Sequence, residues 1–203
     1  RLGAEMLPGV RLLHILDEPL LERVRQRGSL APEDGERLCQ HASAAKAVGA
    51  AAVLVTCSTV SPCVDAVRAA ARIPVLKIDE AMIAEAVSRG RRVGVVATAS
   101  TTLEPTRQAL EARAAAVGRQ VETELVLVEG AMDALMSGDG ARHDRLVARA
   151  VLDLAPQVEV IVLAQASMAR VLEAMPEGEC PVPVLSSPHL ALAEVRRLLA
   201  SGP

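Results

Sequence analysis

No aromatic residue occurs in this chain of 203 residues: phenylalanine, tyrosine and tryptophan are all absent. The core therefore has to be built from alanine, valine, leucine, isoleucine and methionine. A binding site in such a chain has no aromatic walls, which argues against stacking cofactors and against large flat ligands. The same absence removes the surfaces on which single-stranded nucleic acids stack.

Charge of one sign is not concentrated anywhere. The chain has 22 Lys and Arg residues against 25 Asp and Glu residues, a net charge of −3, and no basic run. We therefore expect no nucleic-acid partner. No apolar run reaches the roughly 18 to 20 residues that span a bilayer, and no signal-peptide pattern is present. We expect a cytoplasmic protein without membrane contact.

Metal-binding and disulfide patterns are also missing. None of the four cysteines has CxxC spacing, and no histidine cluster accompanies them, so we expect no metal site. A chain that is 51% hydrophobic does not need a disulfide framework. We expect reduced thiols at Cys39, Cys57, Cys63 and Cys180, with structural roles for Cys63 and Cys180.

What the chain does have is a regular alternation of strand and helix patterns. Apolar runs predict strands at 10–16, 52–55, 73–78, 93–97, 121–128, 158–163 and 182–185. Helical periodicity, bounded by Pro, Gly and capping residues, predicts helices at 19–27, 32–49, 62–71, 80–89, 104–117, 142–154, 168–175 and 190–199, and a short one between Gly130 and Gly138. Continuous apolar strands that alternate with helices are typical of a parallel sheet covered on both faces. The sequence predicts the α/β class.

Two segments of the chain repeat each other. VLVTCST, a helix and IPVLKIDEAM match VIVLAQAS, a helix and VPVLSSPHLAL. Cys57 aligns with Gln165, 108 positions later, and Pro74 aligns with Pro183, 109 positions later. The alternative is that any two βαβ units share such a pattern. The repeat predicts two similar halves, one of residues 1–90 with the helix of 186–203 packed back on it, and one of residues 91–185.

Cys57 lies just after the strand of 52–55. Ser58 and Thr59 come next, and Pro62 follows a few residues later. Open parallel sheets bind their ligands at the carboxyl ends of the strands. Pro62 suits the first turn of a helix, and amide groups at a helix start can favour a thiolate. Cys57 is therefore a candidate nucleophile or base. The alternative is a small core cysteine.

VLVTCST, VIVLAQAS and VGVVATASTT together resemble the aspartate/glutamate/hydantoin racemase family, over the chain from about Val10 onward. The resemblance implies two pseudo-symmetric α/β domains with the active site in the cleft between them. It also implies a cofactor-independent racemase or isomerase that acts at the carbon alpha to a carboxylate of a small acid or amino acid. Family members begin with a strand and a substrate-binding loop that this sequence does not show. Because the chain opens on Arg1 rather than Met, we expect a segment upstream.

The resemblance implies that Cys57 is the catalytic acid or base. Paired-cysteine members of the family use one thiol on each face of the α-carbon, but the second position here is Gln165, whose amide cannot act as a base. Three interpretations remain. The protein catalyses a one-thiol reaction, such as decarboxylation of a substituted malonate or isomerisation through a cysteine adduct; or His189, Asp79 or Glu80 supplies the second proton; or the protein binds a small acid without turning it over.

Other polar residues at strand ends suit a carboxylate or an enolate. The resemblance makes them substrate-binding residues, and helix capping is the alternative: they are Ser58, Thr59, Thr98, Thr101, Gln165 and Ser167. A cysteine hydrolase would need His14 or His189 near Cys57. We otherwise expect a structural role for His14 and exposed positions for His41 and His143. The stretch GVVATAS is not a GxGxxG fingerprint, so we expect no dinucleotide. The expected partner is a small carboxylate substrate, and a homo-oligomer is compatible with this interpretation.

Overall fold

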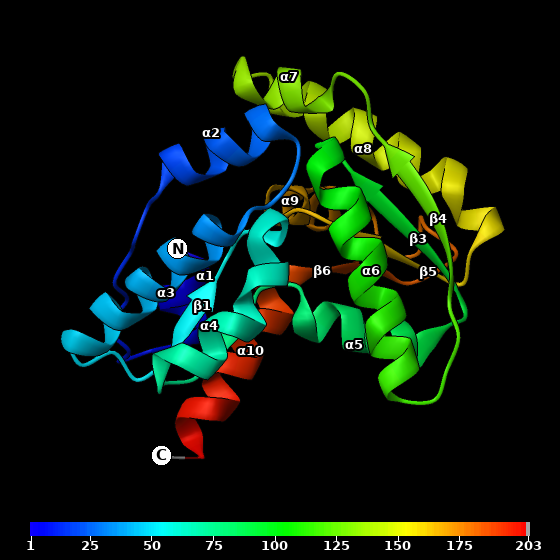
Figure 1. The fold of residues 1–203 in the computed structure, drawn as a ribbon. Helices are drawn as coiled ribbons and strands as arrows, with labels where there is room; N and C mark the ends of the chain where they lie inside the picture. The colour runs from blue at the N-terminus through cyan, green and yellow to red at the C-terminus, as the bar shows by residue number, and fades with distance from the viewer. Residues whose placement is uncertain (202–203) are drawn as a thin grey trace. The chain divides into compact units, whose positions relative to one another are not determined.

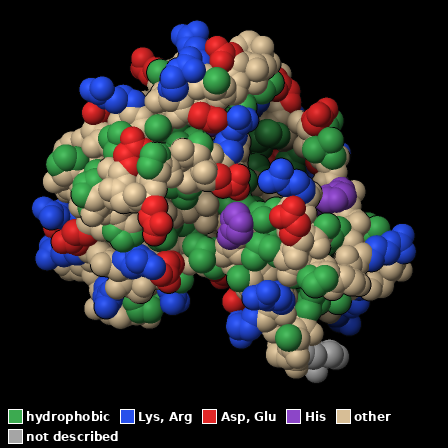
Figure 2. Space-filling view, turned by 180° about the vertical axis from the view of Figure 1, so that it is seen from behind, with side chains coloured by type: hydrophobic (Ala, Val, Ile, Leu, Met, Phe, Trp, Pro, Cys, Tyr) green, Lys and Arg blue, Asp and Glu red, His purple; other side chains and the backbone are tan. Residues whose placement is uncertain are grey.

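The computed structural model describes residues 1–201. The chain divides into two compact units, which we call unit 1 (Arg1–Ile78 together with the segment from His189 onward) and unit 2 (Asp79–Pro188). No helix of the described residues is long and apolar enough to cross a membrane. On the face drawn in Figure 2, side chains of both charge signs are interspersed.

Unit 1 is built on a small parallel sheet of β1 (Val53–Val55) and β2 (Val75–Lys77). Its helices are α1 (Leu2–Met6), α2 (Glu18–Arg27), α3 (Pro32–Ala47), the 3-10 helix η1 (Ser58–Cys63), α4 (Val64–Ala71) and α10 (Ser187–Ala200). Successive residues of β2 point to opposite faces of the sheet. Val75 packs with α3 and α4, whereas Leu76 packs with Leu7 and with Val195 of α10. Helices therefore cover both faces of this sheet.

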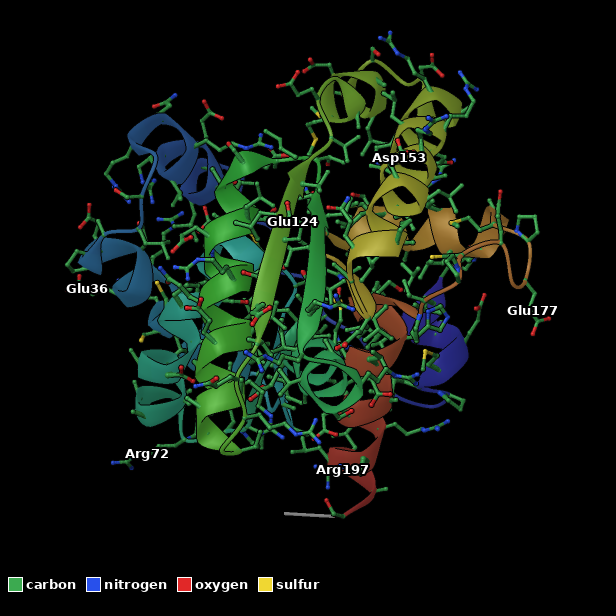
Figure 3. All side chains as sticks on the ribbon, turned by 90° about the vertical axis from the view of Figure 1, so that its right-hand side faces the viewer. Glu36, Arg72, Glu124, Asp153, Glu177 and Arg197 are labelled. Atoms are coloured by element: carbon green, nitrogen blue, oxygen red, sulfur yellow. The ribbon has the colours of Figure 1, made fainter. Side chains whose placement is uncertain are left out.

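Unit 2 is built on a parallel sheet with the strand order β4-β3-β5-β6. The strands are β3 (Arg92–Ala97), β4 (Glu122–Leu127), β5 (Val160–Leu163) and β6 (Val184–Ser186). The helices are α5 (Glu80–Arg89), α6 (Ser100–Ala116), α7 (Ala131–Met136), α8 (Gly140–Leu154), the 3-10 helices η2 (Ala155–Gln157) and η3 (Ala166–Met168), and α9 (Ala169–Ala174). Figures 1 and 3 show the sheet between α6 on one side and α8 on the other. Strand β5 is completely buried, as expected for a central strand covered on both faces.

The repeat in the sequence is present in the backbone. The amide of Val53 donates to the carbonyl oxygen of Pro74 at 2.9 Å, and the amide of Ile161 donates to that of Pro183 at the same distance. The two donors are 108 positions apart and the two acceptors 109, the offsets found in the sequence. In both places a 3-10 helix follows the first strand and leads into an α-helix. The two segments therefore share strand register as well as sequence pattern.

The structure corrects three expectations about the elements. Residues 10–16 form no strand, and His14 lies on exposed coil. The helix expected from Pro62 begins as the 3-10 helix η1 at Ser58, and α4 starts only at Val64. Helix α5 lies in unit 2, whereas the sequence division placed residues 80–89 in the first half; it contacts α6, β5 and β6.

Candidate active site

Cys57 lies where β1 ends and η1 begins. Its backbone is extended, with φ −125° and ψ 110°, and its carbonyl oxygen accepts a hydrogen bond from the amide of Val60 at 3.2 Å. The half-buried side chain packs against a cluster formed by Leu20 and Val24 of α2 and by Val60. The Cys57 side chain is thus partly covered by a cluster to which α2 contributes two residues, and it keeps partial access to solvent.

Ser58 and Thr59 follow Cys57 in the first turn of η1, and both are buried, with 8% and 5% of their surface exposed. The sequence predicted an α-helix that starts at Pro62, whose first amides would favour a thiolate at Cys57. Because η1 separates Cys57 from α4, the first α-helical amides occur after Val64. The start of an α-helix therefore does not follow directly on Cys57.

In unit 2, Gln165 has the position that corresponds to Cys57. It precedes η3, its backbone is extended with φ −134° and ψ 139°, and its carbonyl oxygen accepts from the amide of Met168 at 3.1 Å. Its side-chain Oε1 accepts a hydrogen bond from the backbone N–H of Thr98 at 2.6 Å and another from the Thr98 hydroxyl at 3.1 Å. A backbone N–H can only donate, so the carbonyl end of the Gln165 amide must face Thr98, and its NH₂ group faces elsewhere.

Strand pairing explains why these two predicted residues meet. Strands β3 and β5 are neighbours, with Val96 opposite Leu163, so the loops after their carboxyl ends are adjacent. Thr98 is buried, Thr101 lies half-buried in the first turn of α6, and Ser167 is exposed in η3. The structure joins Thr98 to Gln165 and places Thr101 and Ser167 in the helices that follow.

Two histidines are not where the sequence analysis placed them. His143 is completely buried; its Nδ1 lies 2.8 Å from Oδ1 of Asp144, and its Nε2 has no hydrogen-bond partner among the described residues. It belongs to the buried face of α8 that continues with Val147 and Val151 at intervals of four, which its charged neighbours in sequence hide. His41 is only partly exposed, and its Nε2 lies 2.6 Å from Oδ2 of Asp17.

The remaining candidates for a second proton donor are spread over both units. His189 is exposed in the first turn of α10, in unit 1. Asp79 is buried at the N-cap position of α5, without a side-chain hydrogen bond to the first amides of the helix, and Glu80 follows it on the surface. Their proposed role therefore stays a prediction.

The sequence analysis missed a polar cluster around Asp17. This carboxylate accepts from the amide of Leu20 at 3.1 Å, from Nη2 of Arg37 at 3.1 Å and from Nε of Arg37, besides its contact with His41. The hydrogen bonds from Arg37 hold the pKa of Asp17 well below its usual range. The signal was available in the sequence, because Arg37 and His41 are four residues apart and share one face of α3.

All four cysteines are free thiols. Burial, with the Asp34 carboxylate nearby, raises the pKa of the Cys63 thiol and so disfavours its thiolate. Among the described residues, no group of three or more His, Cys, Asp or Glu side chains could hold a metal ion.

A shallow groove of about 360 Å³ lies away from these residues, at the amino ends of β3 and β4. It is lined by Arg91, Arg119, Glu111 and Glu122, among others, and Arg91 is paired with Glu122 at 2.7 Å. None of the predicted site residues lines it. The carboxyl ends of the strands remain the candidate site.

Comparison with known proteins identifies the family of this chain. The family model described as Asp/Glu/hydantoin racemase matches residues 2–195. The chain belongs to this family. No curated protein matches the chain.

Solved structures of racemase-type proteins share the fold. A putative Asp/Glu racemase from Yersinia pestis is 19% identical, with a TM-score of 0.70 over 98% of this chain and 89% of that one. An allantoin racemase from Klebsiella pneumoniae is 23% identical, with a TM-score of 0.66 over 83% of this chain and 67% of that one. An arylmalonate decarboxylase is 20% identical, with a TM-score of 0.59 over 86% of this chain and 80% of that one.

Proposed function

We propose that this protein is a cofactor-independent isomerase of the racemase type, acting at the carbon alpha to the carboxylate of a small acid or amino acid. The observation that carries the proposal is the placement of Cys57, a partly accessible thiol after a parallel strand, in a chain of the Asp/Glu/hydantoin racemase family. Cys57 as thiolate removes the α-proton and becomes a thiol. The two electrons of the C–H bond pass to the carboxylate, which becomes an enediolate. Inversion then needs a proton on the opposite face of that carbon, a role for which His189, Asp79 and Glu80 are the candidates, because return of the proton by Cys57 itself gives exchange with retention.

Polar groups at the strand ends would stabilise that enediolate. Its oxygens need hydrogen-bond donors, and a carbon acid without a metal or a cofactor depends on such donors for most of its barrier lowering. We assign this role to the NH₂ group of Gln165, whose carbonyl end is already held by Thr98. Hydroxyl groups complete the set of binding residues: Ser58, Thr59, Thr101 and Ser167.

Gln165 favours a second candidate, a one-thiol decarboxylase of a substituted malonate. An amide cannot take up or release a proton near neutral pH, so the position that corresponds to Cys57 in unit 2 cannot act as a second base. Decarboxylation needs no base: loss of carbon dioxide leaves the enediolate, and Cys57 has only to donate one proton. One solved structure with this fold is an arylmalonate decarboxylase.

The first test is proton exchange in D₂O. Aspartate, glutamate, a hydantoin and a substituted malonate are incubated separately with the protein, and the α-proton and the products are followed by NMR. Exchange with retention of configuration means that Cys57 acts alone on one face. Exchange with racemisation means that a second donor exists, and His189 is then the next residue to replace. Release of carbon dioxide identifies the decarboxylase.

Variants separate catalysis from folding. Cys57→Ala should reduce exchange by at least about a hundredfold, the usual contribution of a positioned acid or base. Cys63→Ala removes a thiol of similar burial in the same unit and should leave the rate unchanged. Full activity of Cys57→Ala would disprove the proposed mechanism. Absence of any reaction in the panel, with a folded wild type that binds the acids, would favour a relative that binds small acids without turning them over.

A further inference from the structure

Helix α2 is weakly anchored for an element that contributes to the apolar cluster next to Cys57. Half of its sequence, EPLLERVRQR, is charged, and only Leu20 and Val24 are buried. In the described part of the chain, no other helix or strand packs closely along its backbone. A helix of ten residues is marginal by itself in water, so α2 depends on the few side chains that hold it.

The two buried side chains of α2 belong to the apolar cluster next to Cys57. Leu20 and Val24 form one apolar cluster with Val60 of η1, and Cys57 and Val55 pack against that cluster. Movement of α2 would therefore open the apolar cluster against which Cys57 packs.

Polar contacts fasten α2 to α3 near both of its ends. At the start, Asp17 is the N-cap residue and is paired with Arg37 and His41. At the end, Arg27 is paired with Asp34, whose carboxylate is completely buried, and with Glu33 at 3.2 Å. We call these two groups the Asp17 clasp and the Arg27 clasp. All of their α3 partners lie in the first ten residues of that helix.

The segments on both sides of α2 have no regular structure. Residues 10–17 form neither helix nor strand, and Figure 1 shows them as a long blue coil between α1 and α2. Gly28 ends α2 in the left-handed region, with φ 76°, a conformation that glycine adopts without strain. Neither connection is fixed by pairing in a sheet, so both can accommodate a rotation of the helix.

We propose that α2 is a hinged cover over Cys57, latched to α3 by the Asp17 and Arg27 clasps, and that release of α2 controls access to the thiol. Local opening of this kind is drawn from the least stable parts of a fold, and α2 has two features of such a part: little buried apolar surface and irregular connections. The proposal concerns access to Cys57 and does not require the reaction proposed above.

The test measures alkylation of each cysteine by iodoacetamide, under native conditions, with peptide mass spectrometry. Asp17→Asn keeps the N-cap acceptor for Leu20 but removes the charge that binds Arg37 and His41. We expect Cys57 to react roughly three to ten times faster in this variant, the range that corresponds to loss of a partly exposed ion pair. Arg37→Gln removes the same pair from the α3 side and should have the same effect.

The salt dependence of Cys57 alkylation is a second measurement, and it should not change if the ion pairs of α2 have a purely structural role. Iodoacetamide is neutral, so sodium chloride does not change its encounter with the thiol, but salt weakens exposed ion pairs. Alkylation of wild-type Cys57 should therefore accelerate with salt, and this acceleration should be smaller in Asp17→Asn, which has already lost the Asp17 clasp.

The other cysteines are internal controls. Cys63 lies in the same unit, so a parallel increase at Cys63 would mean that unit 1 loosens as a whole, and it would overturn the proposal. Asp153→Asn removes an exposed ion pair with Arg149 on α8, where Asp153 is labelled in Figure 3, and should change no rate. An unchanged Cys57 rate in both clasp variants, or a wild-type rate equal to that of the unfolded chain, would also overturn it.

Discussion

The carboxamide of Gln165 differs from a thiol in that its two ends are chemically distinct. Its Oε1 atom accepts hydrogen bonds from both the N–H and the hydroxyl of Thr98. Rotation of the amide by 180° would place its NH₂ group, a donor, against the backbone N–H of Thr98, which can only donate. The orientation of the NH₂ group is thereby fixed by the protein. Thr98, which the sequence analysis assigned to substrate binding, uses its N–H and its hydroxyl on Gln165 and is best described as the residue that positions it.

Substitutions of Gln165 should show this asymmetry in stability. Gln165→Leu leaves the Thr98 donors of a buried residue without an acceptor, and we expect a loss of about 1–3 kcal/mol in the free energy of unfolding. Gln165→Glu retains an acceptor for both donors and should lose less. Since the chain has no aromatic residues, far-ultraviolet circular dichroism in urea is the measurement. Equal losses in both variants would show that Oε1 is not the atom that matters.

The stability of unit 1 should depend on pH through the ionisation of Asp17. Its pKa is held below the value of about 3.9 that an unfolded chain has, mainly by hydrogen bonds from Arg37, so the folded state favours the charged form. This contribution is complete above the unfolded pKa and is lost as the pH falls through that value toward the folded pKa. Asp17→Asn should be less stable than wild type at pH 7, by about 1–2 kcal/mol.

The difference in the free energy of unfolding between wild type and Asp17→Asn should then shrink as the pH is lowered from 5 to 3. Other carboxylates with lowered pKa values, such as Glu104 at about 2, are present in both proteins and cancel in the comparison. The measurement is the urea midpoint of each protein at a series of pH values. A difference that stays constant with pH would mean that the charge of Asp17 does not contribute.

At the residue scale, the sequence could reveal candidates but not their contacts. Cys57 was found because it follows a strand pattern, and Gln165 was found because the repeat aligns it with Cys57. The hydrogen bonds between Gln165 and Thr98 depend on the register of β3 against β5, which the sequence pattern does not specify. The burial of His143 was missed because charged neighbours on both sides outweighed the spacing of Val147 and Val151.

The segment 10–16 shows why a correct pattern can give a wrong element. Gly9 and Gly118 are 109 positions apart and both have positive φ, 78° and 67°; α1 ends just before the first and α6 just before the second. At this offset residues 13–18 correspond to β4, which pairs with β3 alone. The described part of unit 1 has no strand that corresponds to β3, so the segment has the apolar pattern of a strand but no neighbour to pair with.

The consequence is an exposed apolar segment. Leu13, Ile15 and Leu16 have 52%, 53% and 83% of their surface exposed. Extended segments with unpaired backbone and apolar side chains promote association between chains. Ile15→Lys should reduce aggregation on concentration, measured by light scattering, and should change the free energy of unfolding by less than about 0.5 kcal/mol. Met136→Lys, at a separate exposed position on α7, is the control and should have little effect.

The elements themselves were largely predictable, because an apolar run bounded by turn residues is a local signal. The strands from 53 to 186 and most helix ends follow the sequence pattern within a few residues. The start of α6 was not predicted: the expected helix began at Glu104, whereas α6 begins at Ser100 and contains Pro105. Helix starts depend on which amide groups find partners, and that is settled by the fold.

In the whole molecule, the helix that follows the final strand of each unit belongs to the other unit. Helix α5 follows β2 of unit 1 in the chain but belongs to unit 2, and α10 follows β6 of unit 2 but belongs to unit 1. Unit 1 is therefore made from both ends of the chain. The side of its sheet that carries Leu76 is fully covered only once α10 has docked, a contact of long sequence separation that slows folding.

A substitution in α10 should therefore act on residues far away in sequence. Val195 is buried against Leu7 and Leu76, so Val195→Asp places an unpaired charge in that cluster and should cost more than about 3 kcal/mol. Hydrogen–deuterium exchange followed by mass spectrometry should show faster exchange in peptides of residues 1–78 and unchanged exchange in peptides of 79–188. Arg196→Asp, at the exposed neighbouring position, is the matched control and should leave both regions protected. Faster exchange that is confined to α10, or that spreads equally through residues 79–188, would show that α10 is not part of the core of unit 1.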